Sequence, residues 1–188
     1  MKNALILHGT DFENTYRQKE NNWFPWLKSE LEKKGYTVFL PELPQAHDPH
    51  ILRYWDFLQS FPFNEETIVI GHSSGAAALF ALLNKLPQEK KIKLAVSVAG
   101  FYKDEGWNCK GLFIDSLDWN KVKKQSEKII LIYSDDDPYV KPYHAEYIGS
   151  KLGISPVLLK GQKHFNLEAG EQWKSFPELL KLILASID

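Results

Sequence analysis

Hydrophobic positions form six short, almost uninterrupted runs, separated by longer stretches in which apolar residues recur every three or four positions. Short runs without alternation are typical of strands that are buried on both faces of a parallel sheet. We therefore expect strands over Ala4–Leu7, Thr37–Leu40, Thr67–Ile70, Leu94–Val98, Ile129–Tyr133 and Pro156–Leu159. The longer stretches have the helical period and predict helices over about Trp23–Lys34, His50–Phe61, Ser74–Leu86, Tyr143–Lys151 and Glu171–Ile187.

Strands and helices alternate along the chain, which is the pattern of the α/β class. Such alternation predicts right-handed β–α–β units and one parallel sheet of about six strands, with helices on both of its faces. Gly35 and Gly153 support two of the helix ends, because glycine is common just beyond a helix C-terminus. The segment Ala99–Ser126 breaks the alternation, and there we expect only a short helix around Asp118–Lys124.

Length and composition are those of one globular domain over residues 1–188. The chain is 44% hydrophobic and 25% charged, with a net charge of −1. It has no long block of like charge, so that neither a nucleic acid nor a membrane surface is expected as a partner.

Cysteine usage and hydropathy point to a cytoplasmic location. The single cysteine, Cys109, excludes an intrachain disulfide and a cysteine-rich zinc site, and it is interpreted as a structural or incidental thiol. The apolar run at the N-terminus is too short for a signal peptide. No apolar run approaches the roughly 18 residues of a membrane span.

The segment Gly71-His72-Ser73-Ser74-Gly75 is the most informative motif. An apolar run rich in β-branched residues leads into it, and a stretch of small residues with helical character follows. This is the strand, sharp turn and helix that lift a serine hydroxyl above the end of a sheet. Glycines two positions before and after Ser73 are expected because the chain approaches itself closely in such a turn.

A serine hydroxyl needs a histidine to take its proton and an acid to orient that histidine. In a parallel sheet these groups come from loops at the carboxyl ends of the strands. After the fifth strand stand Asp135, Asp136 and Asp137, and a lone His164 follows the last strand. The order serine, aspartate, histidine is that of the α/β-hydrolases. Adjacent aspartates are more often turn formers or helix caps, and this is expected of two of the three.

Acyl transfer also requires donors for the oxyanion of the tetrahedral intermediate. We expect the backbone N–H of Ser74 as one donor, since it follows the nucleophile at a helix N-terminus. The second is expected from the loop after the first strand, at the N–H of Thr10 or Asp11. His8 is expected to shape that loop, and His72 to pack inside the turn. The histidines have no metal-ligand spacing, and no metal is expected.

Five features in this order resemble the compact α/β-hydrolases related to retinoblastoma-binding protein 9. They are His8-Gly9, Trp23-x-x-Trp26, Gly71-His72-Ser73-Ser74-Gly75, Ser134-x-x-Asp137-Pro138 and His164-Phe165. The resemblance implies Ser73 as nucleophile, His164 as base and Asp137 as the orienting acid. It also implies a serine hydrolase without a large cap domain and without a cofactor.

The chain departs from this pattern at two positions. The third aspartate leaves Asp136 as a second choice for the acid. Lys163 stands where hydrolases often carry glycine before the histidine. The Leu-x-Cys-x-Glu motif associated with retinoblastoma-protein binding is absent, so that no protein partner follows from the resemblance.

Aromatic residues near the expected site suggest an apolar pocket for the substrate. Phe101, Tyr102 and Trp107 are the expected pocket walls, because Ala99–Ser126 follows the carboxyl end of a strand. Core packing is the more common role for the other aromatics in this region, which are Phe12, Trp119, Tyr139 and Phe165.

The expected reaction is hydrolysis of a small carboxylic ester through an acyl-Ser73 intermediate, with amide and thioester substrates left open. The alternative hypothesis is a hydrolase-fold interaction module with weak or no turnover. A nucleotide-dependent enzyme is disfavoured, because the chain contains neither Gly-x-Gly-x-x-Gly nor Gly-x-x-x-x-Gly-Lys.

Overall fold

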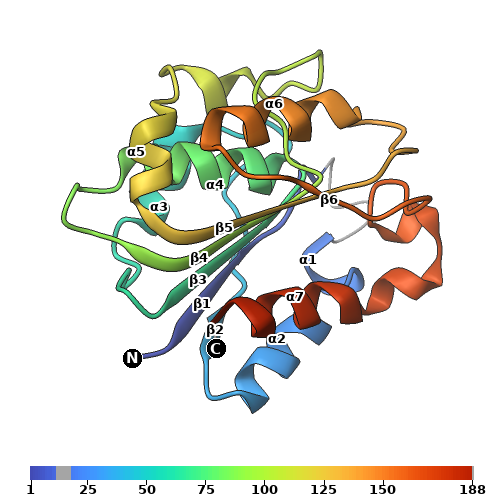
Figure 1. The fold of residues 1–188 in the computed structure, drawn as a ribbon, viewed down its shortest axis with the longest axis horizontal. Coiled ribbons are helices and arrows are strands. Elements are labelled where there is room, and N and C mark those ends of the chain that lie inside the picture. The colour runs from blue at the N-terminus through green and yellow to red at the C-terminus, as the bar shows by residue number, and fades with distance from the viewer. Residues whose placement is uncertain (12–17, 188) are drawn as a thin grey trace.

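A computed structural model describes residues 1–11 and 18–187 of the chain. The described residues form one six-stranded sheet in the order β2-β1-β3-β4-β5-β6, and every pair of neighbours is parallel (Figure 1). The strands are β1 (Asn3–Leu7), β2 (Thr37–Phe39), β3 (Thr67–His72), β4 (Ile92–Val98), β5 (Ser126–Tyr133) and β6 (Val157–Leu158).

Helices cover both faces of this sheet. The α-helices are α1 (Gln18–Asn21), α2 (Phe24–Lys33), α3 (Ile51–Leu58), α4 (Ser74–Lys85), α5 (Trp119–Lys124), α6 (Pro142–Leu152) and α7 (Pro177–Ile187). Three short 3₁₀ helices are η1 (Lys110–Phe113), η2 (Leu167–Ala169) and η3 (Glu171–Lys174). Figure 1 shows α2 and α7 on one face and α3, α4, α5 and α6 on the other.

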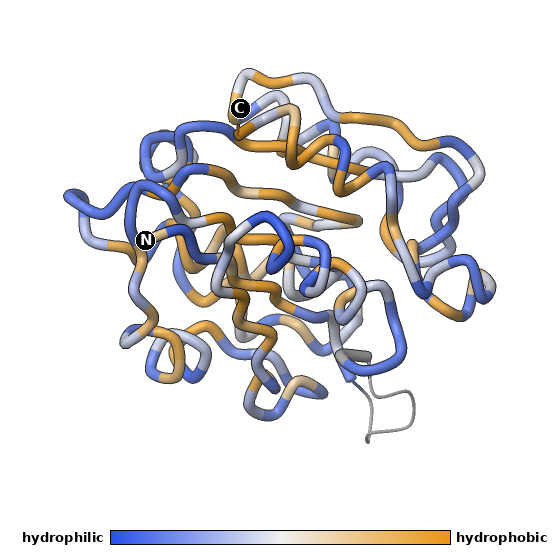
Figure 2. Tube along the Cα trace, turned by 90° about the horizontal axis from the view of Figure 1, so that it is seen from below, coloured by the Kyte–Doolittle hydropathy of each residue, from blue (hydrophilic) through white to orange (hydrophobic). Residues whose placement is uncertain are grey.

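Residues of β1, β3, β4 and β5 enter two separate cores, one on each face of the sheet. In β3, Val69 packs with residues of α3 and α4, whereas Ile68 and Ile70 pack with residues of α2 and α7. Both sides of the strands are therefore apolar, which is why their sequences show no alternation. In Figure 2 the hydrophobic stretches gather along the central strands and the connecting loops are mostly hydrophilic.

The expected α/β architecture is confirmed, with some shifted boundaries. β4 begins at Ile92 and β5 at Ser126, both earlier than expected. The expectation of one helix over Glu171–Ile187 is wrong, because the chain is extended at Ser175, with φ −144° and ψ 160°, between η3 and α7. Pro177 lacks a backbone N–H and disfavours helical conformation at the residue before it, so that a new helix starts there.

The strand order places a crevice at the carboxyl ends of β1 and β3. After β1 the chain adds β2 at one edge of β1, and it then returns to add β3 at the opposite edge of β1. Such a reversal leaves an open crevice where ligands bind in α/β sheets. No helix in the described part of the chain is long and apolar enough to cross a membrane.

Candidate active site

The turn between β3 and α4 holds Ser73 in a strained conformation, with φ 54° and ψ −122°. A Cβ added to Gly71 would lie 2.5 Å from the carbonyl oxygen of Gly75. A Cβ added to Gly75 would collide with the carbonyl oxygens of Leu7 and His8 at the end of β1. Both glycines are therefore required by close backbone approach, and β1 confines the turn from outside.

His164 connects Ser73 to Asp137 by hydrogen bonds. Its Nε2 lies 3.0 Å from Ser73 Oγ, and its Nδ1 lies 2.8 Å from Asp137 Oδ2. Asp137 is 3% exposed, and its Oδ1 accepts the N–H groups of Tyr139 and Val140. With Nδ1–H donating to the carboxylate, Nε2 accepts the serine hydroxyl, as proton abstraction from that hydroxyl requires.

The other two aspartates of the run bind backbone instead of the imidazole. Asp135 Oδ1 accepts the N–H of Gly161, and Asp136 Oδ1 accepts that of Lys163, both at 2.8 Å. Both residues lie in a turn, as expected of two of the three aspartates, and these bonds in addition span 26 and 27 positions of the chain. The Ser134 hydroxyl, and after it the Lys163 N–H, hold the pKa of Asp136 below its usual value.

His72 packs against His164 and bonds to its backbone. Its Nε2–H donates to the carbonyl oxygen of His164 at 2.8 Å, and the two rings lie 4.9 Å apart. Burial, followed by the proximity of His164, lowers the pKa of His72 from 6.5 to about 3, which keeps its ring neutral. On the other side, Trp23 Nε1–H donates to the carbonyl oxygen of Phe165 at 2.9 Å. His72 thus does more than the packing expected of it.

The loop after β1 has its peptide groups fixed by His8. The N–H of Leu43 donates to His8 Nε2 at 3.0 Å, so that Nδ1 carries the proton and donates to the Gly9 carbonyl at 2.8 Å. In a trans peptide the N–H of Thr10 points opposite to that carbonyl. The N–H of Asp11 bonds to Ala46 at 3.4 Å, which leaves Thr10 as the candidate donor of this loop.

Ser74 opens α4, where the first N–H groups of a helix have no partner within the helix. Its side chain is buried and accepts the Thr10 hydroxyl at 2.8 Å. The two expected oxyanion donors, Ser74 and Thr10, are therefore joined to each other beside Ser73.

A cavity of about 250 Å³ opens beside Ser73. Its lining consists of Gly9, Thr10, Asp11, His72, Ser73, Phe101, Trp107, Cys109, Tyr139, Val140, His164, Asn166 and Glu168. Phe101 and Trp107, both expected as walls, lie in it with ring centroids 4.8 Å apart.

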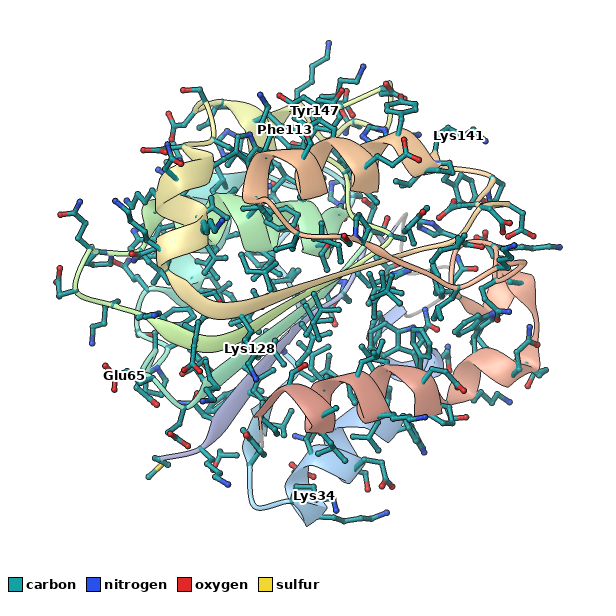
Figure 3. All side chains as sticks on the ribbon, viewed as in Figure 1. Lys34, Glu65, Phe113, Lys128, Lys141 and Tyr147 are labelled. Atoms are coloured by element: carbon teal, nitrogen blue, oxygen red, sulfur yellow. The ribbon has the colours of Figure 1, made fainter. Side chains whose placement is uncertain are left out.

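Tyr102 is a correction, because it is not part of this lining. Its ring stacks on Tyr147 of α6 at 3.8 Å, and Figure 3 shows Tyr147 on the outer side of that helix. Phe165 is fully buried and stacks on Phe176, and Trp119 packs against Phe80. Phe12 lies outside the described residues.

Several lining residues were not anticipated. Asn166 and Glu168 follow His164 by two and four positions, and this proximity was the only available signal. The Tyr139 hydroxyl donates to Glu168 at 2.7 Å and joins the loop of Asp137 to the loop of His164. Cys109 is fully buried in the wall, and burial raises the pKa of its thiol to about 11. No group of His, Cys, Asp and Glu among the described residues is arranged to hold a metal ion.

The parallel sheet, the serine turn after β3 and the later loops of aspartate and histidine define an α/β-hydrolase fold. The described residues contain no inserted cap domain. Residues 4–184 match the family model described as serine hydrolase. The chain therefore belongs to the serine hydrolase family.

Two curated relatives cover most of the chain. YdeN of Bacillus subtilis is 30% identical over 90% of this chain and 88% of its own length. The serine hydrolase RBBP9 of Rattus norvegicus is 23% identical over 87% of this chain and 85% of its own. Both matches confirm the resemblance to the compact α/β-hydrolases related to retinoblastoma-binding protein 9.

Solved structures show the same fold. The ydeN gene product from B. subtilis superimposes with a TM-score of 0.87 at 23% identity, covering 99% of this chain and 98% of its own. Est1E from Butyrivibrio proteoclasticus, solved with bound ferulic acid, has a TM-score of 0.66 at 11% identity, covering 100% and 90%. Family and structural relatives together support a hydrolase function.

Proposed function

We propose that the chain hydrolyses small carboxylic esters through an acyl-enzyme intermediate on Ser73. The observation that carries this proposal is the continuous hydrogen-bonded chain from Ser73 Oγ through His164 to Asp137. A cavity with aromatic walls lies directly beside the serine and offers an apolar site for an acyl group or a leaving alcohol.

Acylation begins when Ser73 Oγ attacks the ester carbonyl carbon and His164 Nε2 takes the hydroxyl proton. The carbonyl oxygen becomes an oxyanion, which the N–H groups of Thr10 and Ser74 stabilise. When the tetrahedral intermediate collapses, the C–O bond to the alcohol breaks and His164 gives the proton to the leaving oxygen. Asp137 keeps the imidazole oriented and stabilises its cationic form.

Deacylation repeats these steps with water. His164 takes a proton from water, the hydroxide oxygen attacks the acyl carbon, and the bond to Ser73 Oγ breaks as the serine recovers its proton. The products are a carboxylic acid and an alcohol. Thioesters and amides with the same acyl group would enter by the same route, and a panel of acyl chain lengths ranks them.

The test compares two neighbouring serines. A fluorophosphonate should label the wild-type chain, and p-nitrophenyl acetate should be cleaved. Ser73→Ala should abolish labelling and lower kcat by about 10⁴-fold or more. Ser74→Ala is the matched control, because it keeps its backbone N–H and should still be labelled. Labelling that persists in Ser73→Ala would overturn the nucleophile assignment.

The alternative is an interaction module on the same fold. A folded wild-type chain that neither reacts with the fluorophosphonate nor cleaves any ester of the panel would favour it. We also propose that residues 1–188 act as one domain in the cytoplasm, where the free thiol of Cys109 stays reduced.

A further inference from the structure

Side chains of Ser134–Asp136 meet the backbone of Gly161–Lys163, the loop that leads to His164. We call Ser134, Asp135 and Asp136 the oxygen cradle. One side-chain oxygen of each residue accepts one of three successive N–H groups. The pairs are Asp135 Oδ1 with Gly161 at 2.8 Å, Ser134 Oγ with Gln162 at 2.9 Å and Asp136 Oδ1 with Lys163 at 2.8 Å.

The loop held in this way is strained on both sides of the base. Lys163 and Phe165, the two neighbours of His164, have φ values of 51° and 53°. Residues other than glycine remain in this left-handed region only when surrounding contacts hold them there. Phe165 is held by the Trp23 bond to its carbonyl and by full burial. Lys163 is exposed, and two bonds fix its peptide: its N–H donates to Asp136 at 2.8 Å, and the Gln162 carbonyl of the same peptide accepts the Phe165 N–H at 3.3 Å.

Charge and geometry both make Asp136 the centre of the oxygen cradle. Its Oδ1 accepts the Ser134 hydroxyl at 2.7 Å as well as the Lys163 N–H. Hydrogen bonds to an ionised carboxylate are about twice as strong as bonds between neutral groups. Successive N–H groups near a left-handed residue form a concave site that favours an anion, and a carboxylate of the chain itself fills it here.

We propose that Asp136, supported by Ser134, is a positioning residue that keeps His164 within reach of Ser73 by holding Lys163 in its left-handed conformation. The inference rests on the proposed roles of Ser73, Asp137 and His164. Asp136 touches neither the cavity nor the reacting atoms. Its loss should therefore lower kcat and leave KM unchanged, because misplacing a catalytic group by about 1 Å costs up to about 10²-fold in rate.

The first experiment measures kcat and KM of Asp136→Ala with p-nitrophenyl acetate. We expect kcat to fall about 10- to 100-fold and KM to stay within about twofold. Asp118→Ala is the matched control, because its carboxylate also accepts backbone N–H groups, those of Asn120 and Lys121 at the start of α5. Asp118→Ala should lose stability and keep its kcat.

A second substitution tests the conformational part of the proposal. Glycine adopts positive φ without strain and keeps its N–H. Lys163→Gly in the Asp136→Ala background should therefore recover about fivefold in kcat. The left-handed conformation is less populated by residues other than glycine by about that factor or more. A purely structural role of Asp136 would give no such recovery.

Three results would overturn the inference: an unchanged kcat in Asp136→Ala, an equal loss in Asp118→Ala, or no recovery with Lys163→Gly. If Asp136→Ala does not fold, Ser134→Ala replaces it, because it removes the hydroxyl that donates to Asp136 and accepts the Gln162 N–H. An unchanged kcat in that folded variant would likewise overturn the inference. Failure of the proposed function is distinguishable, because the wild-type chain would then not react with a fluorophosphonate at Ser73.

Discussion

The serine turn and the acid–base loops place their reactive groups in different ways. The turn consists of five consecutive residues, Gly71 to Gly75, and its geometry follows from steric limits on the backbone next to β1. The acid–base loops, residues 134–137 and 161–164, are joined by side-chain bonds between positions 26 to 28 apart. The serine turn is therefore shaped by consecutive residues packed against β1, whereas the position of His164 depends on side-chain bonds between two distant segments.

This difference predicts different consequences of mutation. A substitution that adds atoms to the serine turn should act on folding, because the neighbouring groups are backbone and cannot move aside. A substitution that removes a bond between the acid–base loops should act on the rate first, because the loops remain anchored by their other bonds.

Gly75→Ala should have the largest effect. Its Cβ would collide with the carbonyl oxygens of Leu7, the last residue of β1, and of His8, which follows it. We expect the free energy of unfolding to fall by about 3 kcal/mol, measured by urea denaturation, with loss of fluorophosphonate labelling. Gly35→Ala is the control, because it has a φ of 83° and open space around it, and should cost about 1 kcal/mol. Equal losses in the two variants would contradict the steric explanation.

Asp137→Asn should have the largest effect within the acid–base loops. The amide cannot hold His164 in the tautomer that accepts from Ser73, and kcat for p-nitrophenyl acetate should fall about 10³- to 10⁴-fold. Asp136→Asn keeps an acceptor oxygen for Lys163 and should lose less than about tenfold. The reverse ranking would identify Asp136 as the acid.

His72→Phe should have an intermediate effect on rate. The phenyl ring retains the packing against Trp23 and Phe24 but cannot donate to the His164 carbonyl. Losing one hydrogen bond at the base should lower kcat by about tenfold. An unchanged kcat would mean that the bond does not contribute to the position of His164.

The same variant should alter the pH dependence of stability. Because the pKa of His72 is lowered from 6.5 to about 3, the unfolded chain binds a proton between these values that the folded chain does not. This contribution therefore destabilises the wild-type fold as pH falls below about 6.5, by up to about 1.4 kcal/mol per pH unit. In His72→Phe this part of the slope should disappear from urea denaturation series between pH 4 and 7, and identical slopes would contradict the assignment.

Trp23→Phe should have the smallest effect on rate. It removes the indole N–H that donates to the Phe165 carbonyl, and it also replaces a fully buried indole by the smaller phenyl ring. We expect a loss of about 2 kcal/mol in the free energy of unfolding and less than about threefold in kcat. Trp26→Phe is the control and should cost less, because Trp26 lies in α2, just after the N-cap Trp23, and is only partly buried against the same core. A large loss of kcat in Trp23→Phe would mean that the base is held mainly from this side.

The order of strands and helices and the family of the chain could be predicted from the sequence. Both depend on apolar periods and on short motifs, which are local. Strands β1 and β3, which flank Ser73, and the glycines around Ser73 are recognisable from such local patterns too. The helix expected over residues 171–187 was predicted as continuous because its apolar period continues through the break at Ser175.

The side-chain assignments around the cavity could be predicted only in part. Phe101 and Trp107 line it and Tyr102 does not, although all three follow β4 within one loop. Stacking of Tyr102 on Tyr147 is a contact with α6, which no local pattern indicates. Likewise, three adjacent aspartates look equivalent in sequence, and resemblance to a family was needed to favour Asp137.

By itself, the sequence determined the parallel α/β architecture, the strained serine and the chain order of serine, aspartate and histidine. These follow from side-chain periods and from the steric demands of neighbouring residues. Only the tertiary structure decided which aspartate oxygen meets the imidazole and which ones hold the loop before it. Those bonds join segments brought together by the pairing of β5 with β6, and hydrogen bonds of this kind depend on distances and angles in space.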